Sequence, residues 1–357
     1  MHNPILFFIL ICLFYSSTPS KAQEESEKKP KKPSLAADTN YITSYPDLLT
    51  IGLYTASPIM QLTIKPLQKD MEKYRSDFRG NFSDQIGLTL AYKKISLQFG
   101  IKTPFGPGKS DDKGKTKTLG IIIRVRKPNY ILEGQYRRYR GYYDNNTPNY
   151  VPTDTVAVRP DIQFNHLGVN GIYNFSWKKY SYNAPLTFND RQLKSRIGLL
   201  AKAGINYMTI SSNDSTLLSS VQASGFSAFD DVRAINALLL KAGPGLGVNI
   251  VVFKRFYLAL SGFLMGNLVG YTYDVKDKDR SKWGLNANVY YESAIGFGYN
   301  SKRLFAGVNF NGDINTMRIR GASIRTNFAT IFITAGYRFN TPKFLKTGYK
   351  KVGFLNK

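Results

Sequence analysis

The sequence contains little of the side-chain chemistry on which most enzymes and metal sites depend. Its one cysteine, Cys12, lies in an apolar run near the N-terminus, and His166 is the only histidine apart from His2. Beyond Cys12 the chain therefore has no disulfide, no thiol nucleophile and no thiolate metal ligand, and a histidine-rich metal site is excluded as well. We expect no metal and no cofactor.

A helix long enough to cross a membrane is also missing, because no apolar run approaches the roughly 18 residues that such a helix needs. The run Ile5–Tyr15 is shorter, and the small residues Ser20 and Ala22 follow it in the pattern of a signal-peptidase site. We therefore expect residues 1–22 to be a secretory signal peptide that is cleaved near Ala22. Residues 23–47 begin with a charged, proline-bearing stretch and are expected to form a disordered periplasmic arm.

Acidic residues are scarce, since 24 Asp and Glu oppose 49 Lys and Arg and the formal net charge is +25. In a cytosolic protein this balance would indicate a nucleic-acid partner. Export favours anionic headgroups instead, so we expect outer-membrane lipid and lipopolysaccharide as partners and no nucleic acid. A solvated basic surface without a partner is the alternative.

A period-two alternation runs from Leu48 almost to the C-terminus. In Ser195–Met208, for example, Ile197 and Leu199 alternate with Arg196 and Gly198, so that one face suits lipid and the other suits water. Most of these segments run for ten residues or more. Soluble strands average roughly 5–6 residues, whereas roughly 9–11 are needed to cross a bilayer. The alternation therefore favours an outer-membrane barrel over a soluble periplasmic domain.

Short basic turns and longer polar loops alternate between the predicted strands, as in outer-membrane barrels. We predict strands at about 48–64, 85–92, 95–102, 117–126, 130–140, 162–175, 195–209, 237–252, 255–266, 283–299, 303–312 and 326–339. The longer, external loops are Thr103–Thr116, Gly141–Pro160, Ser211–Ile235, Asn267–Lys282 and Asp313–Arg325. The predicted fold is all-β: a transmembrane antiparallel barrel of twelve strands over residues 48–339, or fourteen if Pro58 interrupts the first strand, followed by a basic tail, residues 340–357.

The segment Ser176–Lys194 decides the strand count. As a strand it would make the number odd, whereas two periplasmic chain ends require an even number. We therefore assign it to an inner-side connection that acts as a plug or a periplasmic contact, with Lys179, Tyr180, Tyr182 and Phe188 as the candidate residues.

The inward faces of the predicted strands carry many charged side chains. These lumen candidates are Lys102, Arg124, Arg126, Glu133, Arg137, His166, Arg196, Lys202, Lys241, Glu292 and Arg338. Eight cations thus oppose two carboxylates, and two hypotheses follow. The lumen is either a narrow pore that prefers small anionic solutes, or it is blocked by a network in which Glu133 and Glu292 pair with arginines.

Two further functions remain open. A lipid-modifying hydrolase would use His166, but no serine is held near it by sequence spacing, so we assign no catalytic residue. Surface binding would use the predicted loops Gly141–Pro160 and Ser211–Ile235.

Several short motifs occur in a fixed order along the mature chain: Asp38-Thr39-Asn40-Tyr41-Ile42, Tyr136–Tyr143, Arg159-Pro160-Asp161, Tyr173-Asn174-Phe175, Lys179–Tyr182 and Gln192–Ser195. With these motifs the chain resembles, over about residues 38–339, the Bacteroidetes outer-membrane barrel family catalogued as domain of unknown function 4421. The resemblance implies the cell outer membrane as location, and it implies no established activity and no catalytic residues. In barrels of this kind a final aromatic is read by the barrel assembly machinery. Gly336, Tyr337 and Phe339 have this form, but the chain continues beyond them.

Overall fold

A computed structural model describes residues 36–103, 111–213, 215–276 and 282–351. The expected signal peptide and residues 23–35 of the expected arm lie outside the described residues. Among the described residues, no helix has the length and hydrophobicity to cross a membrane.

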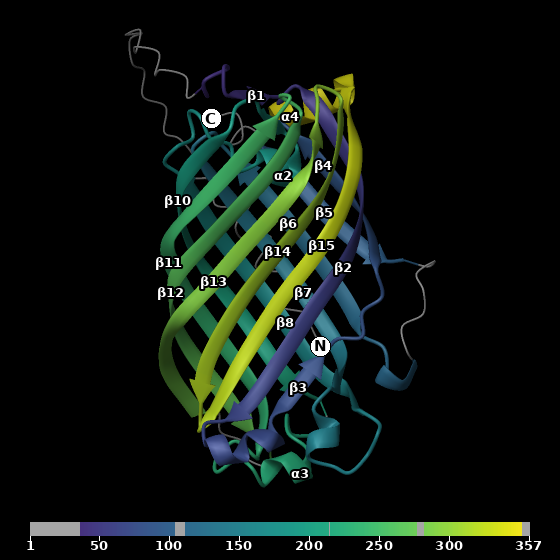
Figure 1. Ribbon diagram of the computed structural model, residues 1–357, viewed down its shortest axis with the longest axis vertical. Coiled ribbons are helices and arrows are strands. Elements are labelled where there is room, and N and C mark those ends of the chain that lie inside the picture. Colours follow the sequence, from purple (N-terminus) through teal and green to yellow (C-terminus); the bar gives the residue numbers. More distant parts are fainter. Residues whose placement is uncertain (1–35, 104–110, 214, 277–281, 352–357) are drawn as a thin grey trace, which may run out of the picture. The chain divides into compact units, whose positions relative to one another are not determined.

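A single antiparallel sheet of thirteen strands closes on itself (Figure 1), because the last strand pairs with the first along its whole length. One member, β3 (Ser76–Arg79), pairs only with the ends of β2 and β7, so the other twelve strands complete the wall. These twelve are β2 (Leu48–Pro66), β4 (Gln85–Tyr92), β5 (Ile95–Lys102), β6 (Lys117–Arg126), β7 (Tyr130–Asp144), β8 (Ala157–Asn174), β10 (Arg196–Ser212), β11 (Val232–Val252), β12 (Phe256–Val275), β13 (Lys282–Asn300), β14 (Leu304–Ile319) and β15 (Ala322–Asn340). The predicted twelve-stranded antiparallel barrel is confirmed, and fourteen is wrong because β2 continues unbroken through Pro58.

The outward faces form an apolar band. Ile197, Leu246 and Val289 are exposed by 67%, 59% and 62%, and most strands place large apolar side chains on the same face. Exposure of such a large apolar surface to water would be unfavourable, whereas contact with the hydrocarbon chains of lipid suits it.

The short turns and the long connections define the two ends of the barrel. The end with the turns at Lys93-Lys94 and Lys254-Arg255 is called the inner end, and the opposite end, which carries α3 (Ser220–Ala223), is called the outer end (Figure 1). Other short elements are η1 (Lys69–Tyr74), η2 (Asp111–Lys113), η3 (Thr147–Asn149) and α2 (Ala184–Thr187).

Several strands run further toward the outer end than the alternation predicted. β14 and β15 meet in a tight turn at Arg320-Gly321, so the expected loop Asp313–Arg325 is mostly strand, and β12 covers much of the expected loop Asn267–Lys282. The reason is a reversal of polarity. Near the outer end, inward side chains such as Met317 are buried and apolar. The alternation of polar and apolar residues by which the strands were predicted is therefore lost there.

Both flanking segments contain regular structure. Within the arm that was expected to be disordered, β1 (Ile42–Ser44) pairs antiparallel with β9 (Asp190–Gln192), so backbone pairing orders it. The basic tail begins as helix α4 (Lys343–Lys351), which is anchored where the ring of Tyr349 packs edge-on against Tyr92, with the centroids 5.5 Å apart.

Candidate functional site

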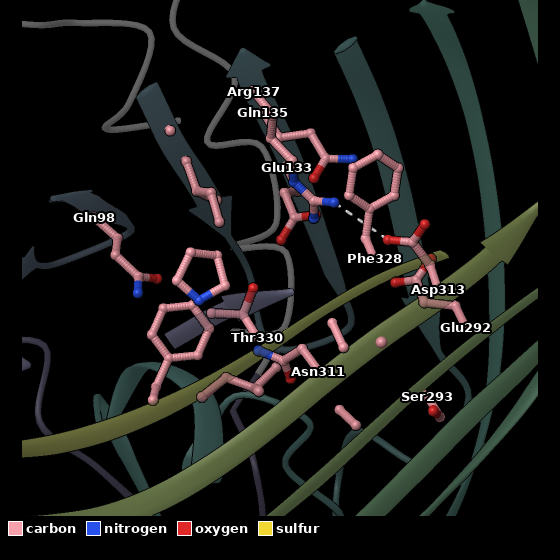
Figure 2. Close-up of a pocket in the computed structure, with 18 of the residues that line it drawn as sticks. Gln98, Glu133, Gln135, Arg137, Glu292, Ser293, Asn311, Asp313, Phe328 and Thr330 are labelled. Atoms are coloured by element: carbon pink, nitrogen blue, oxygen red, sulfur yellow. Dashed lines mark hydrogen bonds and ion pairs between the residues drawn. The ribbon is translucent and has the colours of Figure 1, made fainter. Parts of the chain in front are cut away.

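A cavity of about 140 Å³ lies inside the barrel, and we call it the chamber (Figure 2). Charged side chains project into it from β6, β7, β10, β13 and β14. They are three cations and three carboxylates: Arg124, Arg137, Lys202, Glu133, Glu292 and Asp313. The lining described by the structure is therefore balanced in charge.

Each chamber cation has a carboxylate partner. Arg124 Nε lies 2.6 Å from Glu133 Oε2 on the neighbouring strand. Arg137 Nη1 lies 3.2 Å from Asp313 Oδ2 across the lumen, the contact drawn as a dashed line in Figure 2. Lys202 donates to Glu292 Oε1.

A fourth cation adjoins the chamber. Lys241 Nζ lies 4.0 Å from Glu292 Oε2 and 3.9 Å from the ring centroid of Tyr290. A buried charge is costly unless it is paired, and these contacts supply a partner for the buried ammonium group of Lys241.

Apolar side chains cover the outer side of the chamber, and we call them the outer core. Tyr139 and Phe328 line the chamber, with ring centroids 5.8 Å apart, and Phe164 packs 4.9 Å from Phe328. Beyond them the β10–β11 connection inserts four buried side chains between the strand ends: Leu217, Leu218, Phe226 and Phe229. These apolar side chains form one packed cluster at this end.

The segment Ser176–Lys194, which we call the inner plug, lies on the inner side of the chamber and contributes Tyr182 and Leu186 to its lining. Tyr180 is buried over Gly198 and Gly247, where an added Cβ would come within 2.1 and 2.0 Å of its ring or hydroxyl atoms. Phe188 stacks on Phe305 with centroids 4.5 Å apart. Glycine is therefore needed at both wall positions to admit the plug.

Polar contacts fasten the inner plug to the barrel wall. Arg338 donates to the carbonyl oxygen of Phe188 and to Asn300 Oδ1, the latter at 2.7 Å. Arg126 Nη1 lies 2.9 Å from Asp190 Oδ1, and Ser181 Oγ donates to Asp190 Oδ2 at 2.9 Å.

The surroundings of the Asp190 carboxyl favour its ionised form. Burial alone would raise the pKa of Asp190. The positive charge of Arg126 and the hydroxyl groups of Ser44 and Ser181 lower it by more than burial raises it, so the pKa lies below its ordinary value.

The predicted lumen residues fall into separate groups. Arg124, Glu133, Arg137, Lys202 and Glu292 line the chamber. Arg126 and Arg338 hold the inner plug, as described above. Arg196 lies at the inner rim and donates to Tyr41 Oη at 2.8 Å, while Lys102 is exposed at the end of β5. Neither of these last two lines the chamber.

His166 is buried on the inward face of β8, with Arg137 and Met208 as its cross-strand partners. Its Nδ1 has no hydrogen-bond partner in the described part of the chain. A hydroxyl nucleophile would need to lie within hydrogen-bond reach of this ring, and no such contact occurs among the described residues. Nor do three or more His, Cys, Asp or Glu side chains within these residues gather as metal ligands.

The remaining candidates lie at the inner end. Tyr182 lines the chamber and packs 6.0 Å from Phe263, centroid to centroid. Lys179 is exposed, with its ammonium 5.2 Å from the ring centroid of Tyr41. Tyr337 and Phe339 face outward, 4.8 Å apart, and Gly336 packs under Phe305.

Sequence reasoning missed two features of the site. Asp313 was assigned to an external loop, although it completes the charge balance of the chamber. The outer core was missed as well. A continuous alternation through Gly312–Ile319, with Ile314 outward and Met317 inward, was the available signal for both.

Several solved outer-membrane proteins have a similar fold. The outer-membrane protease OmpT of Escherichia coli is 11% identical, with 84% of this chain and 98% of that chain covered at a TM-score of 0.37. The toluene transporter TodX of P. putida is 8% identical (83% and 91% covered, TM-score 0.25), and a Pseudomonas aeruginosa FadL homologue is 9% identical (82% and 90%, TM-score 0.24).

A search of curated proteins finds no match. The family model described as "Domain of unknown function (DUF4421)" matches residues 36–339, and the chain therefore belongs to this family.

Proposed function

We propose that the protein is a sealed, non-conducting β-barrel of the outer membrane, in which the lumen contents are structural. The observation that carries the proposal is the matched set of three cations and three carboxylates in a chamber closed on one side by the outer core and on the other by the inner plug. Selective conduction needs a continuous path lined by unpaired charge, whereas each cation that lines the described chamber has a carboxylate partner.

The anion-preferring pore is correspondingly less well supported. It depended on eight inward cations opposing two carboxylates, but only three cations line the chamber and Asp313 supplies a third carboxylate. The hydrolase that would use His166 has no support from its contacts.

The apolar band and the alternation of short and long connections support insertion with the inner end toward the periplasm. In this orientation the inner plug faces the periplasm and the outer end faces the cell exterior. Export through a signal peptide cleaved near Ala22, and recognition of Gly336, Tyr337 and Phe339 by the barrel assembly machinery, complete the proposal.

A second candidate function is display of a rigid binding surface at the outer end. A buried hydrogen bond joins the predicted loops Gly141–Pro160 and Ser211–Ile235, since Gln222 Nε2 donates to Asp144 Oδ2 at 2.7 Å. The same nitrogen donates to Ser76 Oγ of β3 at 2.8 Å. Tyr150 Oη donates to the same Asp144 atom at 3.0 Å, and burial raises the pKa of Tyr150 to about 12. Preorganised loops of this kind suit binding.

Conductance in planar bilayers tests the proposal. Purified barrel whose folding is verified by heat-modifiable migration, and whose insertion is verified by flotation with vesicles, should give no current steps. Reproducible steps would overturn the sealed-barrel proposal. If charge reversal at Arg124 and Arg137 then shifted selectivity toward cations, the pore hypothesis would take its place.

A further inference from the structure

Three cations gather on the outward, lipid-facing wall near the outer end, where β6 and β7 pair. Lys117, Arg138 and Arg140 are exposed and share the face of Leu119 and Leu132, while Tyr139 between the arginines is buried inside. Lys117 and Arg140 are direct cross-strand partners. Like charges placed opposite each other destabilise a sheet unless an anion compensates them.

No carboxylate compensates them within the chain. None of the three forms an ion pair among the residues that the structure describes. The carboxylate of Asp161, on the adjacent part of β8, already forms an ion pair with Arg159 at 2.8 Å and accepts a hydrogen bond from Ser212 Oγ at 2.5 Å. The partners on β8 are instead neutral amides: Gln163 lies opposite Arg140 and Asn165 opposite Arg138.

The patch is held in place by its surroundings. Arg138 Nη2 donates to Gln163 Oε1 at 3.0 Å, which orients the guanidinium and leaves its other N–H groups for a ligand. Thr116, beside Lys117, donates through its hydroxyl to the carbonyl oxygen of Gly141, beside Arg140, at 2.6 Å. Gly141 has φ of 88°, which glycine adopts readily, and the β7–β8 register shifts there.

The depth of the patch indicates what it meets. Outward side chains of β7 change from Tyr130 and Leu132 near the inner end to Arg138 and Arg140. At roughly 3.3 Å per residue along a strand tilted by about 40°, the arginines lie roughly 20–25 Å above Tyr130. This height matches the outer edge of an apolar band about 25 Å tall, the level of outer-leaflet headgroups.

The geometry points to a binding site for the phosphates of an outer-leaflet glycolipid of the lipopolysaccharide class, formed by Lys117, Arg138 and Arg140 with the amides of Gln163 and Asn165. Two arginine forks and a lysine suit phosphate oxygens, which accept charge-assisted hydrogen bonds. The site rests on the outer-membrane orientation of the proposed function but not on whether the lumen is sealed.

The test titrates folded barrel in mild detergent with bisphosphorylated lipid A. The variant carries Lys117→Gln, Arg138→Gln and Arg140→Gln. The control carries Lys254→Gln, Arg255→Gln and Lys302→Gln, which removes the same charge from exposed turns at the inner end. Each cation near an anionic surface raises the binding constant by about a factor of five. The variant should therefore bind on the order of 100-fold more weakly, while the control binds as the wild type does.

Dephosphorylated lipid A, phosphatidylglycerol and inorganic phosphate separate the possible ligands. Dephosphorylated lipid A should bind the wild type as weakly as the bisphosphorylated lipid binds the variant, and inorganic phosphate should not compete at equal concentration. Equal losses in variant and control, or equally tight binding of phosphatidylglycerol, would overturn the inference. Because heat-modifiable migration verifies folding and conductance is measured separately, a failure here is distinct from a failure of the sealed-barrel proposal.

Discussion

Removing the carboxylate of Glu292 is the sharpest perturbation of the chamber. Glu292 is the partner of both Lys202 and Lys241, whose side chains are only 2% and 1% exposed. Glu292→Gln keeps the shape of the side chain but leaves two buried cations without their carboxylate.

The expected cost follows from the burial of these groups. Removing one partner of a buried ion pair costs about 3–5 kcal/mol. Because the Glu292 side chain keeps 23% exposure toward the chamber, the lower end of that range applies, about 3 kcal/mol. This corresponds to a loss on the order of 100-fold in the folding equilibrium constant.

Urea unfolding in lipid vesicles measures this cost, with the fluorescence of Trp177 and Trp283 as the probe. The matched control is Glu72→Gln, since Glu72 pairs with Arg75 at 3.6 Å with both side chains about half exposed. Glu72→Gln should lower the free energy of unfolding by less than about 1 kcal/mol. Adding Lys202→Met to Glu292→Gln should recover at least half of the loss. Equal costs for Glu292→Gln and Glu72→Gln would refute the reasoning, because they would mean that water solvates the chamber charges.

Three other predictions concern the two ends of the barrel. A depressed folded-state pKa means that Asp190 stabilises the inner plug above its unfolded pKa of about 4 and loses this effect as the pH falls through the folded value. Protease cleavage within the plug should therefore rise in acid, and Asp190→Asn should remove that pH dependence; persistence of the same profile would contradict the assignment. Gly247→Ala should expel Tyr180 at a cost of about 1–3 kcal/mol, since the added Cβ would lie 2.0 Å from its hydroxyl, and Tyr180→Ala should rescue it. Gln222→Ala should cost about 1–3 kcal/mol and speed amide exchange around α3; unchanged exchange there would argue against a rigid outer surface.

The barrel wall was predictable because lipid and lumen impose opposite polarities on alternate residues. Ile197 and Leu199 face outward while Lys202 faces inward, and this contrast defined β10 from sequence alone. The contrast reverses near the outer end, where Met317 faces inward, and there the strands were taken for loops. The wall was thus predictable only where it encloses polar side chains.

The site was predictable to a smaller extent. Parity of the strands assigned Ser176–Lys194 to the inner end, and inward periodicity identified Arg124 and Glu133 as lumen residues. The polar contacts that fasten the inner plug could not be derived in this way, because Arg126 reaches Asp190 across 64 residues of sequence and Arg338 reaches Phe188 across 150. Such contacts are set by closure of the barrel and not by local pattern.

Solvent access to the chamber tests the central claim most directly. The only cysteine is Cys12, so Ser261→Cys in a Cys12→Ser background places a single thiol in the chamber lining. Thr155→Cys in the exposed outer loop is the matched control. In proteoliposomes a charged methanethiosulfonate reagent should label Cys at 155 and leave Cys at 261 unmodified from either side until the protein is unfolded. Rapid labelling of the chamber thiol in the folded barrel would contradict a sealed lumen.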